Sequence, residues 1–196
     1  MVHIRIKEIE EYASLNNIPI MQKDGIEFLT DYIKNNNIKN ILEIGSAIGY
    51  SAIKMALVSN DINITTIERD KERYTLAVKN INEFKLQHRI TIINDDALYT
   101  NIEGKYDLIF IDAAKSQYIK FFEKYEKNLN EDGVIVTDNL SFHGLVEDES
   151  KTNNRNTKQL VRKIRKYIDY LNNNDNYITN FYKLGDGIAI SKKKCI

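Results

Sequence analysis

Short runs of β-branched and other apolar residues alternate along this chain with longer stretches of helical periodicity. The short runs, which we expect to be strands, are 40–44, 63–67, 90–93, 106–111 and 133–137. Apolar residues recur every three to four positions between them, which predicts helices at 50–58, 71–84, 118–128 and 157–171. This alternation is typical of a parallel sheet with helices on both faces. We therefore predict an α/β fold.

The end of the chain departs from this alternation. Two strand-like runs, 177–184 and 188–191, are separated by Gly185, Asp186 and Gly187. Asp-Gly is a preferred hairpin turn, so we predict an antiparallel terminal hairpin. Five parallel strands and this hairpin make a seven-stranded, mostly parallel sheet. Ligands of such sheets bind beyond the carboxyl ends of the strands, near the point where the strand order reverses.

The composition narrows the class of protein further. A length of 196 residues with one proline and eight glycines suits a single domain, 1–196, without a linker. The 28 basic residues balance the 28 acidic ones, which argues against nucleic-acid binding by overall charge. The single cysteine, Cys195, excludes an intramolecular disulfide. Because no apolar stretch resembles a signal peptide or reaches the ~20 residues of a membrane span, we expect a cytoplasmic protein without membrane association.

A glycine-containing loop follows the first predicted strand, at residues 43–51 (EIGSAIGYS). Glycines allow backbone N–H groups to approach a ligand closely. Ala47 stands where a dinucleotide fingerprint requires glycine, so pyrophosphate binding is disfavoured. Glu43 suits a ligand with a positively charged amino acid group, which it would neutralise directly or through water. The alternative is an ordinary turn between a strand and a helix.

Two further acidic positions lie at the ends of the next strands. Glu68 follows the second strand, where an acidic residue in such folds accepts both ribose hydroxyls. Asp96 follows the third strand and is a candidate acceptor for the exocyclic amine of adenine. The alternatives are an ion pair between Glu68 and Arg69, and a helix cap at Asp96.

Together these motifs resemble the class I S-adenosylmethionine-dependent methyltransferases, and within them the cation-dependent O-methyltransferases of the catechol and caffeoyl-CoA type. The resemblance is closest to bacterial members that look like the tRNA 5-hydroxyuridine methyltransferase. The matching segments are 18–21 (IPIM), 42–51 (LEIGSAIGYS), 66–70 (TIERD), 96–97 (DA), 110–115 (FIDAAK) and 137–139 (TDN). The resemblance implies a Rossmann-like methyltransferase fold, S-adenosylmethionine as cofactor and a homodimer.

The resemblance also implies which residues line the cofactor, with Ser51 near its carboxylate. The positions that we assign to the cofactor are Met21, Glu43, Gly45, Ala47, Ser51, Glu68, Asp96, Ala97 and Asp112.

Oxygen-bearing side chains end two strands that we expect to be neighbours. Asp112 closes the fourth strand, and Asp138 and Asn139 close the fifth. The ends of neighbouring strands lie about 4.8 Å apart, so these three side chains can converge on a cation at about 2.1 Å. Hard oxygen ligands favour Mg²⁺, with Mn²⁺ also possible, and leave positions for two adjacent substrate oxygens. The alternative is that the carboxylates cap the following helices.

Lys115 lies three residues beyond Asp112. By resemblance it is the general base that takes the hydroxyl proton before the oxygen attacks the methyl group. A neighbouring cation and desolvation would lower the pKa of this lysine enough for that role. His143 is the less favoured alternative base.

The residues 151–168 include seven basic side chains and no acidic ones, a local charge of +7. On a helix, Arg155, Lys158 and Arg162 fall on one side, which predicts a phosphate-contacting stripe. We therefore expect the acceptor to be the 5-hydroxyl of a wobble uridine in tRNA, whose adjacent 4-oxo and 5-hydroxyl oxygens can chelate one metal. The alternatives are a small catechol-like or hydroxycinnamoyl phenol, a non-catalytic cofactor-binding protein that docks RNA, and a merely solvated helix face.

Overall fold

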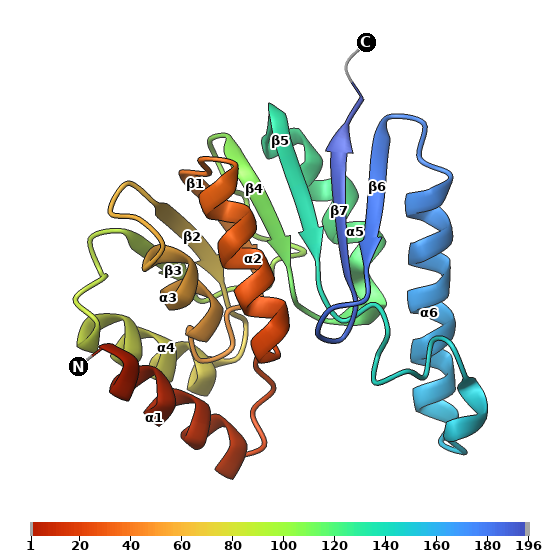
Figure 1. Cartoon of the computed structure of the whole chain (residues 1–196), viewed down its shortest axis with the longest axis horizontal. Coiled ribbons are helices and arrows are strands. Elements are labelled where there is room, and N and C mark those ends of the chain that lie inside the picture. Colours follow the sequence, from red (N-terminus) through yellow and green to blue (C-terminus); the bar gives the residue numbers. More distant parts are fainter. Residues whose placement is uncertain (1, 195–196) are drawn as a thin grey trace.

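A computed structural model describes residues 2–194 of the chain, and Cys195 lies outside them. Within this range, seven strands form one sheet in the order β3-β2-β1-β4-β5-β7-β6 (Figure 1). The first five run parallel, and β7 pairs antiparallel with both β5 and β6. The bounds are β1 (Asn40–Ile44), β2 (Asn63–Ile67), β3 (Ile90–Ile93), β4 (Tyr106–Ile111), β5 (Leu129–Thr137), β6 (Tyr177–Tyr182) and β7 (Ile188–Lys193). The predicted seven-stranded fold is confirmed.

Two strands are longer than predicted. β7 ends at Lys193 instead of Ser191. β5 begins at Leu129 instead of Gly133, because Leu129 pairs with Tyr106 ahead of a register irregularity between Tyr106 and Leu108. The polar residues Asn130–Asp132 that interrupt the apolar run are exposed or half-buried, so they are tolerated at the end of the strand.

Six α-helices and three short 3₁₀ helices lie within residues 2–194. They are α1 (Val2–Leu15), α2 (Lys23–Asn35), α3 (Tyr50–Ala56), α4 (Lys71–Glu83), η1 (Lys115–Gln117), α5 (Tyr118–Tyr125), η2 (Glu126–Asn128), η3 (Glu149–Lys151) and α6 (Arg155–Asn172). The helix α1 is absent from the sequence prediction. α1 buries only Ile6, Ile9 and Ala13, and this narrow apolar stripe is masked by the charged residues between them.

Alternate residues of each central strand enter two separate cores. Leu108 and Phe110 of β4 pack with α2 and α3, whereas Ile109 and Ile111 pack with α5 and α6. In Figure 1, α2 crosses the near face of the sheet and α5 lies behind it. Both faces are therefore covered, which is why the central strands read as continuous apolar runs rather than as an alternating pattern.

The strand order reverses at β1, which lies between β2 and β4. The chain leaves β1 and β4 at the same edge, and the two exits are in close contact: the Asp112 N–H donates to the carbonyl of Ile44 at 3.0 Å. Gly45 has φ +95°, and a Cβ there would lie 2.4 Å from the carbonyl oxygen of Asp112. Only glycine fits between these strand ends.

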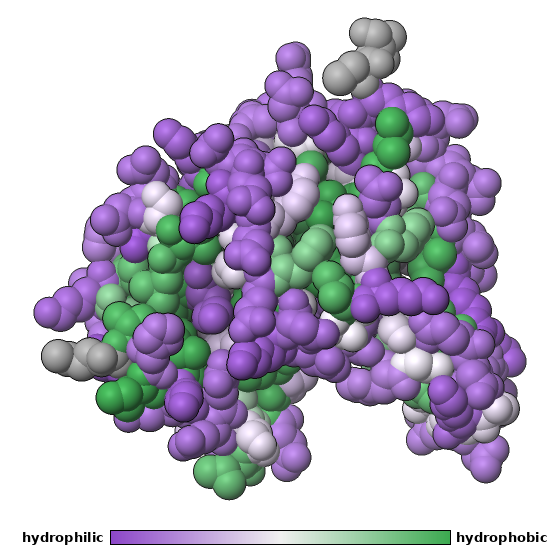
Figure 2. All heavy atoms as spheres, in the orientation of Figure 1, coloured by the Kyte–Doolittle hydropathy of each residue, from purple (hydrophilic) through white to green (hydrophobic). Residues whose placement is uncertain are grey.

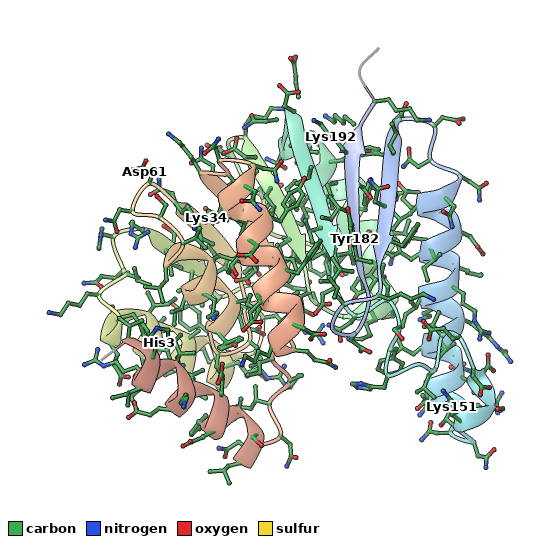
Figure 3. The ribbon with its side chains drawn as sticks, in the orientation of Figure 1. His3, Lys34, Asp61, Lys151, Tyr182 and Lys192 are labelled. Atoms are coloured by element: carbon green, nitrogen blue, oxygen red, sulfur yellow. The ribbon has the colours of Figure 1, made fainter. Side chains whose placement is uncertain are left out.

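The terminal hairpin folds back onto both the sheet and α2. The Gly185 N–H donates to Asp24 Oδ2 at 2.9 Å. Tyr182, which is labelled in Figure 3, lies with its ring centroid 4.8 Å from that of Phe28 on α2. Asp186 is 4% exposed, so this predicted turn residue is buried. Among residues 2–194, no helix combines the length and apolarity needed to cross a membrane.

Candidate active site

A cavity of about 550 Å³ opens at the edge where the parallel strands end. In Figure 2 the outline of the molecule is indented there, between the side that holds α1 and the start of α6. This volume lies in the ordinary range for ligand sites. The predicted site residues that line the cavity are Met21, Gly45, Ala47, Ser51, Glu68, Asp96, Ala97, Asp112, Lys115 and Asn139. The cavity thus brings together most of the predicted cofactor residues, the predicted base and two of the three predicted metal ligands.

Several lining residues are absent from the prediction. They include Pro19, Ile20, Ser46, Tyr50, Arg73, Gln117 and Phe121. Tyr50 was detectable in principle, because it adjoins Ser51 at the start of α3. Its hydroxyl donates to Glu10 Oε1 at 2.7 Å, so it also ties α1 to the cavity wall. Arg73 and Gln117 belong to no predicted motif. They reach the cavity because of how their helices pack, which the local sequence does not indicate.

The glycine loop and Glu68 hold each other. The Ala47 N–H donates to Glu68 Oε2 and the Asp70 N–H donates to Glu68 Oε1, both at 2.8 Å. Ala47 has φ +44°, a conformation that non-glycine residues rarely adopt, and this hydrogen bond helps to hold it. Glu68 is therefore fixed in place before any ribose binds. Arg69 lies 3.8 Å from Asp96 Oδ2, so the ion pair considered for Glu68 forms with Asp96 instead.

Asp96 and Ala97 are also fixed by local contacts. Asp96 Oδ1 accepts the Leu98 N–H at 2.8 Å; a turn and not a helix follows Asp96, so the helix cap considered as the alternative does not form. The Ala97 carbonyl accepts the Tyr125 hydroxyl at 2.6 Å and the Lys124 ammonium at 2.9 Å. These contacts orient the wall at which we predict adenine. Contact of Asp96 with adenine stays a prediction.

Glu43 lies behind the cavity and is fully buried. Its two carboxylate oxygens accept the hydroxyls of Ser51 and Thr66, both at 2.5 Å. Burial raises the pKa of Glu43 to about 7, although the two hydroxyls oppose the shift. Ser51 lines the cavity, so Glu43 reaches it through that hydroxyl.

We expect Glu43→Gln to stabilise the protein at pH 8 and to weaken cofactor binding. A carboxyl whose pKa rises from 4.5 to about 7 on folding lowers the free energy of unfolding as the pH rises through that window. The loss is on the order of 3 kcal/mol at pH 8. Cofactor affinity should fall about tenfold, or about 1.4 kcal/mol, because a charged acceptor behind Ser51 is lost. Thermal melts at pH 5 and 8 and calorimetry check this; an equal gain in melting temperature at both pH values would contradict it.

The predicted metal ligands lie together. Asn139 Nδ2 donates to Asp112 Oδ1 at 2.9 Å and to Asp138 Oδ2 at 3.1 Å. Burial raises the pKa of both carboxyls, that of Asp138 to about 8. The nearby positive charge of Lys115 opposes this rise at both carboxyls. Neither carboxylate caps a following helix, since Ala114 precedes η1 and Asp148 precedes η3.

The donor set fits a hard divalent cation. Asp138 Oδ1 is buried and has no hydrogen-bond partner, and a cation beside it would satisfy this oxygen. Within residues 2–194, no three His, Cys, Asp or Glu side chains converge as metal ligands. The set therefore consists of two carboxylates and one amide, which suits Mg²⁺ or Mn²⁺ better than Zn²⁺. For the side-chain oxygen of Asn139 to bind a cation, the amide group would rotate so that the oxygen takes the place of Nδ2. The two atoms are similar in size, so the rotated amide occupies the same space.

Lys115 begins η1, directly beside the acid pair. Its ammonium lies 5.5 Å from the centroid of the Phe142 ring. The side chain of His143, by contrast, is 71% exposed, and its Nδ1 lies 3.7 Å from Asp186 Oδ1. His143 does not line the cavity, so Lys115 is the better placed of the two candidate bases.

The basic residues on α6 lie apart from the cavity. Arg162 Nη2 is 3.6 Å from Glu149 Oε1, and Arg165 donates to Glu149 Oε2 at 2.9 Å and to the Val146 carbonyl. The cavity is lined by none of the three predicted stripe residues, Arg155, Lys158 and Arg162. Figure 3 labels Lys151 near the start of α6, on the segment that these ion pairs hold to the helix. Part of the predicted stripe is thus neutralised by Glu149.

Comparison with known proteins gives one consistent family. A family model described as O-methyltransferase matches residues 2–194. A crystal structure from Staphylococcus aureus, provisionally named a caffeoyl-CoA O-methyltransferase, is 41% identical with a TM-score of 0.93, covering 96% of this chain and 92% of that one. Caffeoyl-CoA O-methyltransferase from Populus kitakamiensis is 27% identical over 98% of this chain and 88% of its own length. An O-methyltransferase from Bacillus cereus in complex with S-adenosylhomocysteine shares the fold at a TM-score of 0.82 and 24% identity, covering 97% and 90%.

Proposed function

Because the chain belongs to the O-methyltransferase family, we propose that it transfers the methyl group of S-adenosylmethionine to a hydroxyl of a small phenol that carries two adjacent oxygens. The observation that carries this proposal is the arrangement of Asp112, Asp138 and Asn139 next to Lys115, beside the cavity that the glycine loop borders. It brings the predicted cation ligands and the predicted base to the same edge of one cavity.

The cavity offers complementary groups for each part of the cofactor. Glu68 is fixed where it can accept both ribose hydroxyls. Ser51 lines the cavity with Glu43 behind it, and in this proposal it contacts the amino acid end. Asp96 and Ala97 line the cavity, and in this proposal they border the adenine. Met21, which is 4% exposed, supplies an apolar wall from the segment between α1 and α2.

Asp112, Asp138 and Asn139 would hold Mg²⁺ or Mn²⁺. Such an ion, when bound, acidifies a coordinated hydroxyl and orients two adjacent oxygens. Lys115, in its neutral form, then takes the hydroxyl proton on Nζ. The substrate oxygen forms a bond with the methyl carbon, and the bond from that carbon to sulfur breaks, leaving S-adenosylhomocysteine. In-line placement of the three atoms is the main contribution of the site.

Two observations favour a phenol over tRNA as the acceptor. The relatives from Populus and Staphylococcus carry the name of enzymes for caffeoyl-CoA, and the apolar side chains of Pro19, Ile20 and Phe121 line the same cavity as the predicted base. In the basic stripe on α6, by contrast, Arg162 forms an ion pair with Glu149, which reduces the positive charge that tRNA would contact. Methylation of wobble uridine and the homodimer both stay predictions, and the neighbouring Lys115 and acid pair argue against a non-catalytic RNA-docking protein.

Matched acceptors test this proposal. The purified protein is incubated with S-adenosylmethionine, Mg²⁺ and either 3,4-dihydroxycinnamate or 4-hydroxycinnamate, each as the free acid and as the coenzyme A thioester. Mass spectrometry follows the methylated products. We expect methylation only of the dihydroxy compounds, and its loss on chelation of the metal, because two oxygens are needed to occupy the site. A parallel reaction uses tRNA that contains 5-hydroxyuridine. Methylation of that tRNA without methylation of either diphenol would overturn the proposal.

A further inference from the structure

The tip of the terminal hairpin holds a buried carboxylate that the proposed reaction does not use. Asp186 is 4% exposed, and its Oδ2 has no hydrogen-bond partner. Its Oδ1 accepts the backbone N–H of His143 at 2.5 Å, and its carbonyl accepts the N–H of Ser141 at 2.7 Å. The next residue continues this contact, since the Gly187 carbonyl accepts the Leu140 N–H at 2.9 Å. The hairpin tip therefore packs along the segment that follows Asp138.

That segment, which we call the 139–144 loop, has an unfavourable backbone conformation. Asn139, Phe142 and His143 have φ angles of +68°, +49° and +58°. Residues with side chains rarely adopt such angles and keep them only where neighbouring groups hold the backbone. A Cβ on Gly187 would lie 2.7 Å from the Ser141 nitrogen, so the hairpin tip is packed tightly enough to provide that hold.

The 139–144 loop carries two groups of the candidate active site. At one end, Asn139 donates to both Asp112 and Asp138. In its middle, the Phe142 ring lies under the Lys115 ammonium. A change in the loop backbone would therefore move a predicted metal ligand and the support of the predicted base together.

We propose that Asp186 is a positioning residue, which holds the 139–144 loop through the His143 N–H and so aligns Asn139 and Phe142 with the acid pair and Lys115. Its link to catalysis rests on the proposed function; its hold on the loop does not. The alternative is that Asp186 only stabilises the hairpin.

Three variants separate these possibilities. Asp186→Asn keeps an oxygen that can accept the His143 N–H, whereas Asp186→Ala removes it. Asp24→Ala is the matched control, because Asp24 binds the same hairpin through Gly185 on its other side. Asp186→Ser, whose shorter side chain leaves the His143 N–H without its acceptor, replaces Asp186→Ala should that variant not fold.

Amide hydrogen exchange of the 139–144 loop and Mn²⁺ binding followed by electron paramagnetic resonance are the readouts that need no substrate. We expect Asp186→Ala to speed exchange at His143 at least about tenfold and to weaken Mn²⁺ binding by about 10-fold to 100-fold. Asp186→Asn should retain wild-type exchange, and Asp24→Ala should leave both properties unchanged.

Kinetics on an accepted diphenol should show a lower kcat for Asp186→Ala at unchanged cofactor affinity. The proposal would be overturned if Asp186→Ala kept wild-type exchange and Mn²⁺ affinity. It would also be overturned if His143 exchanged as fast in Asp186→Asn as in Asp186→Ala. If the wild-type protein methylates no diphenol, the proposed function fails while the exchange and Mn²⁺ measurements still decide the role of Asp186.

Discussion

Replacing Lys115 with alanine is expected to lower turnover by about 10²-fold to 10⁴-fold, the usual contribution of a general base. Lys115 borders the acid pair at the edge of the cavity, where the hydroxyl proton must leave. Cofactor affinity should stay within about twofold of wild type, because the groups placed for the ribose, adenine and amino acid ends are elsewhere. Single-turnover kinetics measure the methyl-transfer rate, and calorimetry measures cofactor binding.

Two further lysine variants sharpen this test. Lys115→Arg keeps a positive charge beside Asp112 and Asp138 but cannot lose its proton at neutral pH, so it should be as slow as the alanine variant. Lys120→Ala changes an exposed lysine on the first turn of α5 and should behave as wild type. Near-wild-type turnover in Lys115→Arg would show that the charge of Lys115 matters and its basicity does not.

Asp138→Asn is expected to abolish metal-dependent methyl transfer and, without metal, to raise the melting temperature. Burial, together with the charge of Asp112, raises the pKa of Asp138 from 3.8 to about 8. Folding therefore favours the protonated carboxyl, and this contribution to stability is lost as the pH rises through about 8. An asparagine carries no charge to bury, so we expect a gain of about 5 °C at pH 8.5, equivalent to about 2 kcal/mol for a chain of this size.

With added Mg²⁺, the wild-type protein should instead have the higher melting temperature. Mg²⁺ should stabilise the wild-type protein more at pH 8.5 than at pH 6.5, since binding at the lower pH must displace a proton. Asp138→Asn should show little of this stabilisation. Asp61→Asn, which changes an exposed carboxylate remote from the cavity, is the matched control. Equal Mg²⁺ stabilisation of Asp138→Asn and wild type would remove Asp138 from the metal site.

Sequence patterns predict the central strands of this protein most accurately. β1 to β4 match their predicted bounds because each is a short apolar run with polar residues next to it. β1, β2 and β4 lie inside the sheet and are largely buried, whereas β3 lies at its edge and is only partly buried. The helix α1 escapes prediction because it covers a small part of one core, and the contacts that stabilise it, such as Tyr50 with Glu10, join residues 40 positions apart. Local periodicity carries no information about such partners.

The candidate site also combines features that the local sequence predicts with features that depend on distant contacts. Residues that lie directly at strand ends, such as Asp112 and Glu68, are placed in the cavity by the sheet itself. Glu43 belongs to the predicted motif, but only the folded chain reveals that Ser51 stands between it and the cavity. Asp186 has the sequence context of a turn residue, and its buried contact with His143 depends on how the hairpin meets a distant loop. Arg162 likewise acquires Glu149 through a long connection.

The contact between Gly45 and Asp112 has a consequence for how such a protein can change its acceptor. Gly45 belongs to the loop that we predict to surround the methyl donor, and Asp112 belongs to the group that we predict to hold the metal and acceptor, yet their separation is set by main-chain atoms in contact. Under the proposed function, replacement of other side chains that line the cavity, such as Phe121, can therefore reshape the acceptor pocket without altering the distance between the predicted donor and acceptor positions. If the proposed function holds, the alignment required for the reaction and the choice of molecule that undergoes it are controlled by different parts of the chain.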